Sequence, residues 1–289
     1  MSKKIVVVGS LHYDVVVESD RQPRRGETLM GSRWYPKFGG KGGNQACACA
    51  LLGADVQMLG ALGSDGFGDF LRNVLEERGV GHKAVITVPG GSGMSVAIVD
   101  AEGDYAATVV SGANTKIDPE TIRASELIVQ ADALILQNEL HESVNLAAAQ
   151  AAQSSGVQII WNAAPMRADT LGLADMVDVV VVNAVEAEQI TGIVVETIEQ
   201  AELAATALRD GGPSAVVTAG ALGFAWASLG GDSGASKARA VKHPKSHGAG
   251  DVFTAALASA LVAGEGLENS SLLAGEAAWK HVSGVGEDS

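Results

Sequence analysis

The chain has 289 residues, of which 47% are hydrophobic, and its mean hydropathy of +0.18 allows a core large enough to fold without disulfides. The formal net charge of −14 argues against a nucleic-acid partner, which requires a basic face, and no apolar run is long enough to predict a membrane anchor. Cys47 and Cys49 would point in different directions on a helix and cannot pair comfortably, which favours a reducing, cytoplasmic setting.

Short runs rich in Val and Ile alternate along the chain with alanine-rich segments of helical character. This alternation predicts an α/β fold with a doubly wound, mostly parallel sheet and helices on both faces. We expect core strands at residues 5–8, 56–59, 133–136, 157–161, 177–182 and 215–218, and helices at residues 43–52, 67–78, 119–130, 143–154, 197–209 and 249–262.

Two stretches interrupt this alternation, because neither is followed by a crossover helix. Residues 15–17 with 27–34, and residues 94–99 with 105–110, have the pattern of paired strands. We therefore predict a small antiparallel β lid over one edge of the sheet, where it would exclude water from a reaction. Residues 230–236 are small and predict a surface loop.

Polar residues follow the first strand, at the carboxyl edge where open α/β sheets bind ligands. Asp14 would accept hydrogen bonds from paired sugar hydroxyls, with His12 beside it. The alternative interpretation of Asp14 is an ordinary turn or cap residue.

A glycine-rich turn opens the first predicted helix, at residues 39–46. Its glycines let backbone N–H groups approach a polyhydroxylated ligand, Lys41 adds a positive charge, and Asn44 offers both a donor and an acceptor. The alternative is a flexible turn with a helix cap. The turn is not a phosphate-binding P-loop, because no Gly-Lys-Ser or Gly-Lys-Thr ends it, and no dinucleotide fingerprint follows the first strand.

The most informative segment is residues 245–251, where the turn Gly248-Ala249-Gly250 leads into a predicted helix that carries Asp251 in its first turn. Free backbone N–H groups and the helix dipole make this turn an anion site. A carboxylate would repel a stored phosphate, but it suits a base beside a phosphoryl group in transit. The segment therefore predicts phosphoryl transfer to a hydroxyl.

With these three segments the sequence resembles the ribokinase or PfkB family of carbohydrate kinases, in order and spacing over nearly the whole chain. The resemblance implies one Rossmann-like domain over residues 1–289, with lid strands from about 13–36 and 92–112. It also implies ATP with Mg²⁺ as the donor, a sugar hydroxyl as the acceptor, and a possible homodimer through the β lid.

The resemblance also assigns roles to individual residues. It implies that Asp251 is the catalytic base and that Glu186 holds magnesium through water, whereas the residues alone make Asn183 and Glu186 a helix cap. The expected anion hole is Gly248, Ala249 and Gly250; the expected sugar-binding residues are His12, Asp14, Gly39, Gly40, Lys41, Asn44 and Glu139; the expected nucleotide-binding residues are Asn183, Thr218, Gly220, Gly223, Gly250 and Gly275.

The sequence departs from the family pattern at three places. His12 stands where an asparagine is usual, so we expect a different pocket shape and sugar preference. Lys245 stands where ribokinases carry a cation-holding aspartate, which predicts activity independent of monovalent cations. The sequence ends at Ser289, so we expect the usual final helix to be missing.

We therefore predict ATP-dependent phosphorylation of a hydroxymethyl group on a small sugar such as a ribose-like pentose. A kinase for a nucleoside or a keto-sugar is the alternative within the enzyme class, although an aromatic content of 4% favours a free sugar over a nucleoside. A non-catalytic sugar-binding regulator on the same fold is the alternative outside it.

Overall fold

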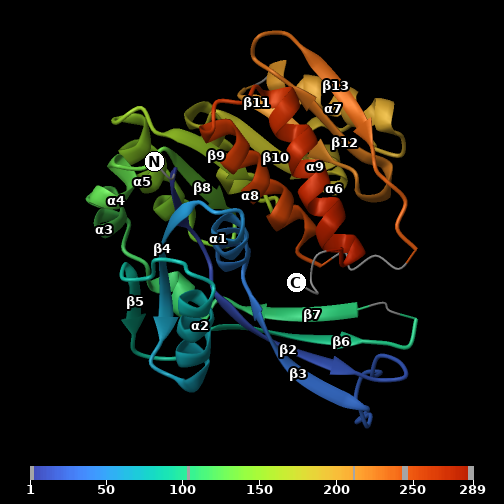
Figure 1. Ribbon diagram of the computed structural model, residues 1–289. Coiled ribbons are helices and arrows are strands. Elements are labelled where there is room, and N and C mark those ends of the chain that lie inside the picture. The colour runs from blue at the N-terminus through green and yellow to red at the C-terminus, as the bar shows by residue number, and fades with distance from the viewer. Residues whose placement is uncertain (1–2, 103–104, 211, 243–246, 286–289) are drawn as a thin grey trace.

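The computed structural model describes residues 3–102, 105–210, 212–242 and 247–285. Its centre is a nine-stranded sheet in the order β13-β12-β11-β10-β9-β8-β1-β4-β5 (Figure 1). Pairings from β5 to β11 are parallel, and β12 and β13 add an antiparallel edge, which confirms the doubly wound fold. The strands are β1 (Lys4–Val8), β4 (Asp55–Gly63), β5 (Val85–Val88), β8 (Ala133–Gln137), β9 (Gln158–Asn162), β10 (Val179–Asn183), β11 (Ser214–Thr218), β12 (Gly223–Ala227) and β13 (Ser233–Lys237).

Helices cover both faces of this sheet because its inner strands are apolar on both sides. Ile5 and Val7 pack into a core with α1, α2, α8 and α9, whereas Val6 and Val8 pack on the opposite face with α3 to α7. The helices are α1 (Lys41–Leu51), α2 (Gly66–Glu77), α3 (Pro119–Arg123), α4 (Glu126–Val129), α5 (Glu142–Gln153), α6 (Ala184–Thr191), α7 (Ile198–Asp210), α8 (Ala249–Val262) and α9 (Leu267–Ser283), with short 3₁₀ turns at Gly112–Lys116, Ala168–Met176 and Gly220–Leu222.

A second sheet of four strands forms the lid, in the order β3-β2-β6-β7, and projects below the ends of α8 and α9 (Figure 1). Its two outer pairings are antiparallel, and the central pair β2–β6 is parallel. Tyr13 anchors the lid to α2, stacking on Phe67 with ring centroids 4.1 Å apart. The lid strands are β2 (His12–Glu18), β3 (Arg33–Gly39), β6 (Gly93–Val99) and β7 (Tyr105–Val110).

Three predicted segments differ from the structure. The strand expected at residues 27–34 begins only at Arg33, because β3 takes its register from β2 and runs on to Gly39. The helix expected at residues 119–130 is two helices, since α3 ends at Arg123 and the extended Ser125 precedes α4, which begins at Glu126. Part of the loop expected at residues 230–236 is strand β13, which pairs with β12.

Cys47 and Cys49 both lie on α1 as free cysteines, and Cys49 is fully buried, which confirms that they do not pair. Within the described ranges, no helix has both the length and the apolar character that crossing a bilayer requires.

Candidate active site

Asp251 lies in the first turn of α8, as predicted, and its side chain is buried. Gly248 precedes the helix with a φ of 81°, a left-handed conformation that favours glycine. The carboxylate accepts hydrogen bonds from Asn44 Nδ2 at 2.9 Å and from Gln45 Nε2 at 3.0 Å. Helix α1 therefore holds the carboxylate at the N-terminus of α8.

The orientation of Gln45 is fixed by residues at the ends of neighbouring strands. Gln137 Nε2 donates to Gln45 Oε1 at 2.7 Å, so the amide nitrogen of Gln45 must face Asp251. That nitrogen also lies 3.3 Å from Asn162 Oδ1. Gln45 lies beside Asn44 in the glycine-rich motif, but no role is predicted for it from sequence.

The environment of Asp251 changes its affinity for a proton. Burial raises the pKa of this carboxyl group, while the positive charge of Lys41 and the amide groups of Asn44 and Gln45 oppose the rise, and Glu139 adds to it. The pKa stays above its ordinary value. A carboxylate with raised proton affinity is suited to act as a general base.

The glycine-rich turn brings three backbone segments close together. Gly40, with a φ of 87°, connects β3 to α1, and a Cβ atom there would lie 2.7 Å from the carbonyl oxygen of Ser10. A Cβ atom on Gly42 would lie 2.6 Å from the Gly9 backbone. This close approach lets the Lys41 N–H donate to Glu139 Oε2 at 2.8 Å.

Glu139 connects this turn to the segment after β1. Ser10 Oγ donates a short hydrogen bond to the same oxygen of Glu139, and His12 Nδ1 lies 3.9 Å from it. The His12 ring is buried, and among the described residues its Nε2 atom has no hydrogen-bond partner. The structure thus brings His12, the Lys41 backbone and Glu139 together, three of the residues expected to bind the sugar.

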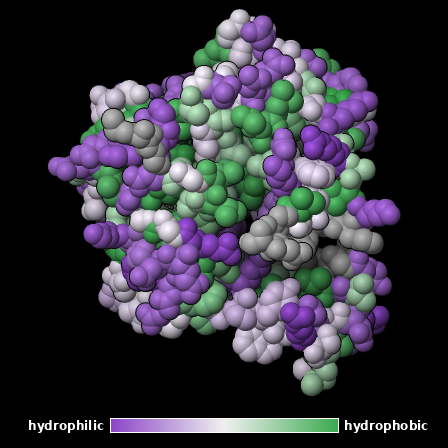
Figure 2. All heavy atoms as spheres, in the orientation of Figure 1, coloured by the Kyte–Doolittle hydropathy of each residue, from purple (hydrophilic) through white to green (hydrophobic). Residues whose placement is uncertain are grey.

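Asp14 approaches the same turn from the lid. Ser95 Oγ donates to Asp14 Oδ1 at 2.5 Å, and a Cβ atom on Gly39 would lie 2.0 Å from Asp14 Oδ2. The predicted sugar-binding residues of the lid and of the turn therefore share one site. Figure 2 shows the surface hollowed between the lid and the helices above it.

Two residues predicted to bind the nucleotide end neighbouring parallel strands. Asn183 and Thr218 are register partners at the carboxyl ends of β10 and β11, and Thr218 Oγ1 donates to Val182 O at 3.3 Å. Gly220, with a φ of 55°, and Gly223, with a φ of 122°, shape the turn from β11 into β12. These residues lie on the same edge of the sheet as Gln137 and Asn162.

Asn183 and Glu186 form the helix cap that the residues alone predicted. The Glu186 N–H donates to Asn183 Oδ1 at 2.9 Å, and the Asn183 N–H donates to Glu186 Oε2 at 2.8 Å. Burial raises the pKa of Glu186, against the opposing effects of that N–H and of Lys41. The buried carboxylate remains in the field of Lys41.

A magnesium ion fits this carboxylate only with water and substrate oxygens as further ligands. The part of the chain that the structure describes holds no group of three or more His, Cys, Asp or Glu side chains placed to bind a metal. Mg²⁺ in phosphoryl-transfer sites keeps several waters and takes one or two carboxylates plus phosphate oxygens. One carboxylate such as Glu186 is compatible with that ligand set.

The remaining predicted residues lie at the start of α8 and in the middle of α9. Gly275 allows α9 to pack on β12, since a Cβ atom there would lie 2.2 Å from the Phe224 ring. Gly250 faces open space. His281 Nε2 lies 2.9 Å from the carbonyl oxygen of His247. Because a carbonyl oxygen only accepts hydrogen bonds, His281 Nε2 is the donor. Helix α9 thereby holds the turn before Gly248. Lys245 lies outside the described residues.

Comparison with known proteins identifies relatives over nearly the whole chain. A family model described as pfkB family carbohydrate kinase matches residues 2–287. A ribokinase of Haemophilus influenzae is 34% identical over 265 residues, which cover 91% of this chain and 86% of the relative. A ribokinase of Arabidopsis thaliana is 32% identical over 285 residues, or 95% of this chain and 74% of the relative.

A solved structure of Arabidopsis thaliana ribokinase complexed with ribose and ATP superposes with a TM-score of 0.87. The two chains are 30% identical, and the match covers 98% of this chain and 93% of the other.

Proposed function

The chain belongs to the pfkB family of carbohydrate kinases, and on this basis we propose that it transfers the γ-phosphoryl group of ATP to a hydroxymethyl group of a small, ribose-like sugar. The related ribokinase structure that holds ribose and ATP supports both the donor and the class of acceptor. The observation that carries the proposal is the buried Asp251 carboxylate at the N-terminus of α8, beside the turn that starts at Gly248.

Asp251 would act as the general base. As the acceptor oxygen forms its bond to the γ-phosphorus, the bond from phosphorus to the bridging oxygen of ADP breaks, and the hydroxyl proton passes to the Asp251 carboxylate. The N–H groups of Gly248, Ala249 and Gly250 would stabilise the negative charge on the phosphoryl oxygens, helped by the dipole of α8. Hydrogen bonds from Asn44 and Gln45 hold the base in place.

The sugar would lie between the glycine-rich turn and the lid. Asp14 and Glu139 offer carboxylate acceptors for hydroxyl groups, and Asn44 offers a donor and an acceptor. Lys41 acts electrostatically on Asp251, Glu186 and His247, so its charge lies where acceptor and phosphoryl group would meet. The lid would exclude water during transfer.

The nucleotide would bind along the carboxyl edge of the sheet, at Asn183, Thr218, Gly220 and Gly223. It would also bind at Gly250, near the start of α8, and at Gly275, on α9. Glu186 would hold Mg²⁺ through water. The ion, when bound, would neutralise charge on the ATP phosphates. The free thiols of Cys47 and Cys49 support a reducing compartment such as the cytoplasm.

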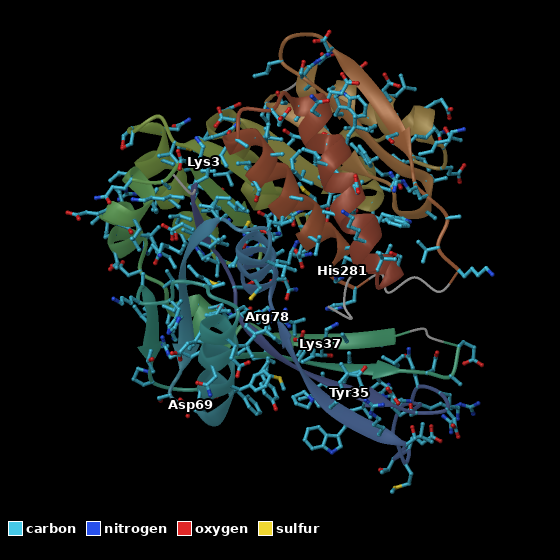
Figure 3. All side chains as sticks on the ribbon, viewed as in Figure 1. Lys3, Tyr35, Lys37, Asp69, Arg78 and His281 are labelled. Atoms are coloured by element: carbon cyan, nitrogen blue, oxygen red, sulfur yellow. The ribbon has the colours of Figure 1, made fainter. Side chains whose placement is uncertain are left out.

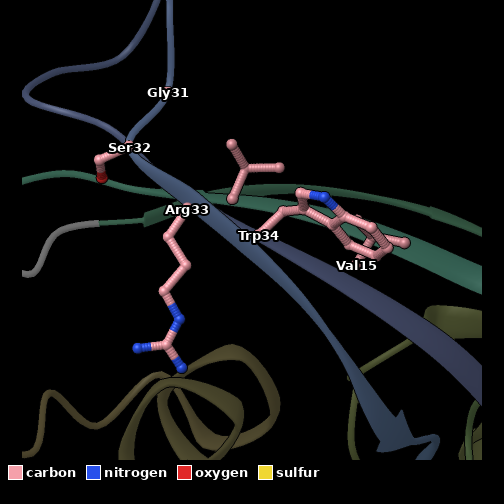
Figure 4. A pocket seen from close by; sticks show the side chains of 6 residues that line it. Val15, Gly31, Ser32, Arg33 and Trp34 are labelled. Atoms are coloured by element: carbon pink, nitrogen blue, oxygen red, sulfur yellow. The ribbon is translucent and has the colours of Figure 1, made fainter.

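A homodimer through the lid is supported by the lid's outer face. Trp34 is 65% exposed there and lies beside a shallow hollow of about 320 Å³ lined by Val15, Val17 and Gly31 (Figure 4). Sedimentation of the wild type and of Trp34→Ser tests this. If the dimer uses this face, the substitution weakens it, so the variant should separate into monomers at protein concentrations at which the wild type is still a dimer. Equal sedimentation of both proteins as monomers would contradict it.

A coupled ADP-release assay over a panel of D-ribose, D-fructose and adenosine, with and without Mg²⁺, tests the proposed function. We expect Mg²⁺-dependent ADP release that is fastest with a free pentose. Preference for adenosine or fructose would favour the nucleoside or keto-sugar alternative. Sugar binding without ADP release would identify a non-catalytic binding protein and refute the proposal.

A further inference from the structure

Gln137 and Asn162 are register partners at the carboxyl ends of the neighbouring parallel strands β8 and β9. Both side chains are buried, and both bond to the side-chain amide of Gln45 on α1, at 2.7 Å and 3.3 Å. Gln45 in turn donates to the carboxylate of Asp251 at 3.0 Å. A pair of strand residues thus reaches the carboxylate of the site through one buried amide.

The direction of this chain of amides is set by the backbone of the sheet. The carbonyl oxygen of Val181 on β10 can only accept a hydrogen bond, so the Asn162 side-chain nitrogen, 3.3 Å away, is the donor to it. The Asn162 side-chain oxygen therefore faces Gln45, and only the nitrogen of the Gln45 amide can bond to that oxygen. The Gln45 nitrogen is thus turned toward Asn162 whatever the charge on Asp251.

Gln137 fixes the other atom of the same amide. With its nitrogen turned toward Asn162, Gln45 presents its oxygen to Gln137, whose Nε2 donates to it at 2.7 Å. The Gln137 side chain packs closely on the end of β1, since its Oε1 lies 2.2 Å from where a Cβ atom on Gly9 would be. A rotated Gln45 would turn oxygen toward oxygen at Asn162 and nitrogen toward nitrogen at Gln137, losing both hydrogen bonds. The buried Gln45 amide therefore has one favourable orientation.

In that orientation the Gln45 nitrogen donates to two acceptors, Asn162 Oδ1 and Asp251 Oδ1. The other oxygen of Asp251 accepts from Asn44. Hydrogen bonds from fixed donors favour the ionised carboxylate, and only the ionised form can take a proton from a hydroxyl group. A rotated Gln45 would turn its oxygen toward Asp251 and favour the protonated acid, which cannot act as a base.

The charges around Asp251 come from the elements that pack against α8, which are α1, α9, β8 and β9. Burial has the largest effect and raises the pKa of Asp251, Lys41 at the start of α1 lowers it, and Glu139 after β8 raises it. Strands β8 and β9 carry no titratable residue. Helix α9 carries titratable residues toward the end that lies nearer the lid (Figure 3): Glu276, Lys280 and His281. All of these groups are distinct from the amides, so the amides can be replaced without changing a charge.

We propose that Gln137 and Asn162 are positioning residues for the base: together they fix the Gln45 amide so that it donates to Asp251, which keeps the carboxylate ionised and in place. Both residues act on Asp251 through Gln45. The register of β8 against β9 thereby controls the protonation of a residue on α8, through a side chain of α1. This inference rests on the proposed role of Asp251 as the base of a kinase.

The experiment compares wild type with Gln45→Met, Gln137→Met and Asn162→Leu, each of which replaces an amide by an apolar group of similar size. The pH dependence of kcat/KM is measured by ADP release with D-ribose. The pKa of Asp251 is measured separately by NMR on protein labelled at the aspartate carboxyl carbons, with the signal assigned by its loss in Asp251→Asn. Asn145→Leu is the matched control, because Asn145 is also buried but donates to the backbone carbonyl oxygen of Gln137.

Gln45→Met removes a hydrogen bond to a charged group, so the acidic limb of the kcat/KM profile and the pKa of Asp251 should both move to higher pH, by about 1 to 2 pH units. Gln137→Met and Asn162→Leu should move both in the same direction by a smaller amount. Combined with Gln45→Met, neither should add a further shift, because both act through Gln45. Asn145→Leu should lower the unfolding temperature and leave both measurements in place.

Unshifted profiles for Gln137→Met and Asn162→Leu would show that Gln45 keeps its orientation without them and would overturn the inference. Shifts that add in the double variants, or an equal shift in Asn145→Leu, would also overturn it, because either result indicates a general loosening of the site. If one of the two single variants does not fold, the other alone tests the inference. If the wild type phosphorylates no sugar, the kinase function fails, and the NMR titration of Asp251 still tests the inference.

Discussion

Replacing Asp251 with asparagine should remove most of the turnover while making the folded protein more stable at neutral pH. The variant keeps the shape of the side chain. Gln45 is fixed by Gln137 and can still donate to the asparagine oxygen, and the Asn44 amide can rotate to accept from the new NH₂ group. Both contacts to α1 are thereby preserved, so the change isolates the charge and the proton affinity of the base.

The expected loss of rate is that of a general base, about 10²- to 10⁴-fold in kcat, which corresponds to about 3–5 kcal/mol of activation free energy. Stability should change in the opposite direction. Because burial raises the pKa of Asp251 above its ordinary value of 3.8, the unfolded chain ionises at lower pH than the folded protein. The carboxyl group therefore contributes stability below the unfolded pKa, and this contribution is lost as the pH rises through the raised value.

Asparagine does not ionise, so the variant should unfold at a higher temperature than wild type at pH 7 to 8, and the difference should shrink as the pH approaches 4. Thermal unfolding across this range, together with the ADP-release assay, measures both effects. Turnover within a factor of about three of wild type would exclude Asp251 as the base. A less stable variant at pH 8 would show that hydrogen bonds to the charged form outweigh burial.

Asp65→Asn is the matched control, because the environment of Asp65 has the opposite effect. Burial alone would raise its pKa, but hydrogen bonds from Ser92 and from the Gly68 N–H hold it below the ordinary value. This carboxylate caps α2, and the stability it contributes is present above the unfolded pKa and lost as the pH falls through the folded pKa. We expect Asp65→Asn to cost about 1 kcal/mol at pH 7, because the new NH₂ group cannot accept the hydrogen bond from the Ser92 N–H, and to retain turnover.

Three further predictions concern the sugar pocket, the glycine-rich turn and the cation requirement. His12→Asn should change the ranking of kcat/KM among pentoses and hexoses and leave the KM of ATP unchanged; an unaltered ranking places His12 outside the pocket. Gly42→Ala should destabilise the fold by about 1–3 kcal/mol in denaturant unfolding, because its Cβ atom would lie 2.6 Å from Gly9, whereas Gly66→Ala, which meets nothing within 4 Å, should not. The resemblance to ribokinases implies that Lys245 stands where a cation-holding aspartate is usual, so we predict equal activity in potassium and sodium at fixed ionic strength; strong activation by potassium would refute this prediction.

The sequence alone predicts those helices and strands that have a regular pattern of apolar residues within their own segment. Helix α8 has the predicted bounds, Ala249–Val262, because a glycine turn precedes one continuous apolar run. The buried parallel strands are equally clear, as in the valine run of β10. Strand β13 consists of small residues with weak strand preference and exists because it pairs with β12, so local pattern could not predict it.

The residues of the candidate site also differ in whether a local motif predicts them. Asp251, Lys41 and Asn44 follow from motifs that a reader can find in the sequence. The role of Gln45 depends on contacts to Asp251 and Gln137, which are about 90 to 200 positions away and meet only when the sheet forms. The contact of His281 with the His247 carbonyl oxygen likewise connects α9 to the turn before α8.

The two cysteines of α1 can report when this helix detaches from the sheet. Burial raises the pKa of Cys47 to about 11 and that of Cys49 to about 12, so both thiols stay protonated and unreactive at neutral pH while the helix is packed. A thiol-modifying reagent would label Cys49 only in molecules in which α1 has left the sheet. Labelling kinetics would therefore measure how often the helix that carries Asn44 and Gln45 detaches, without any engineered probe.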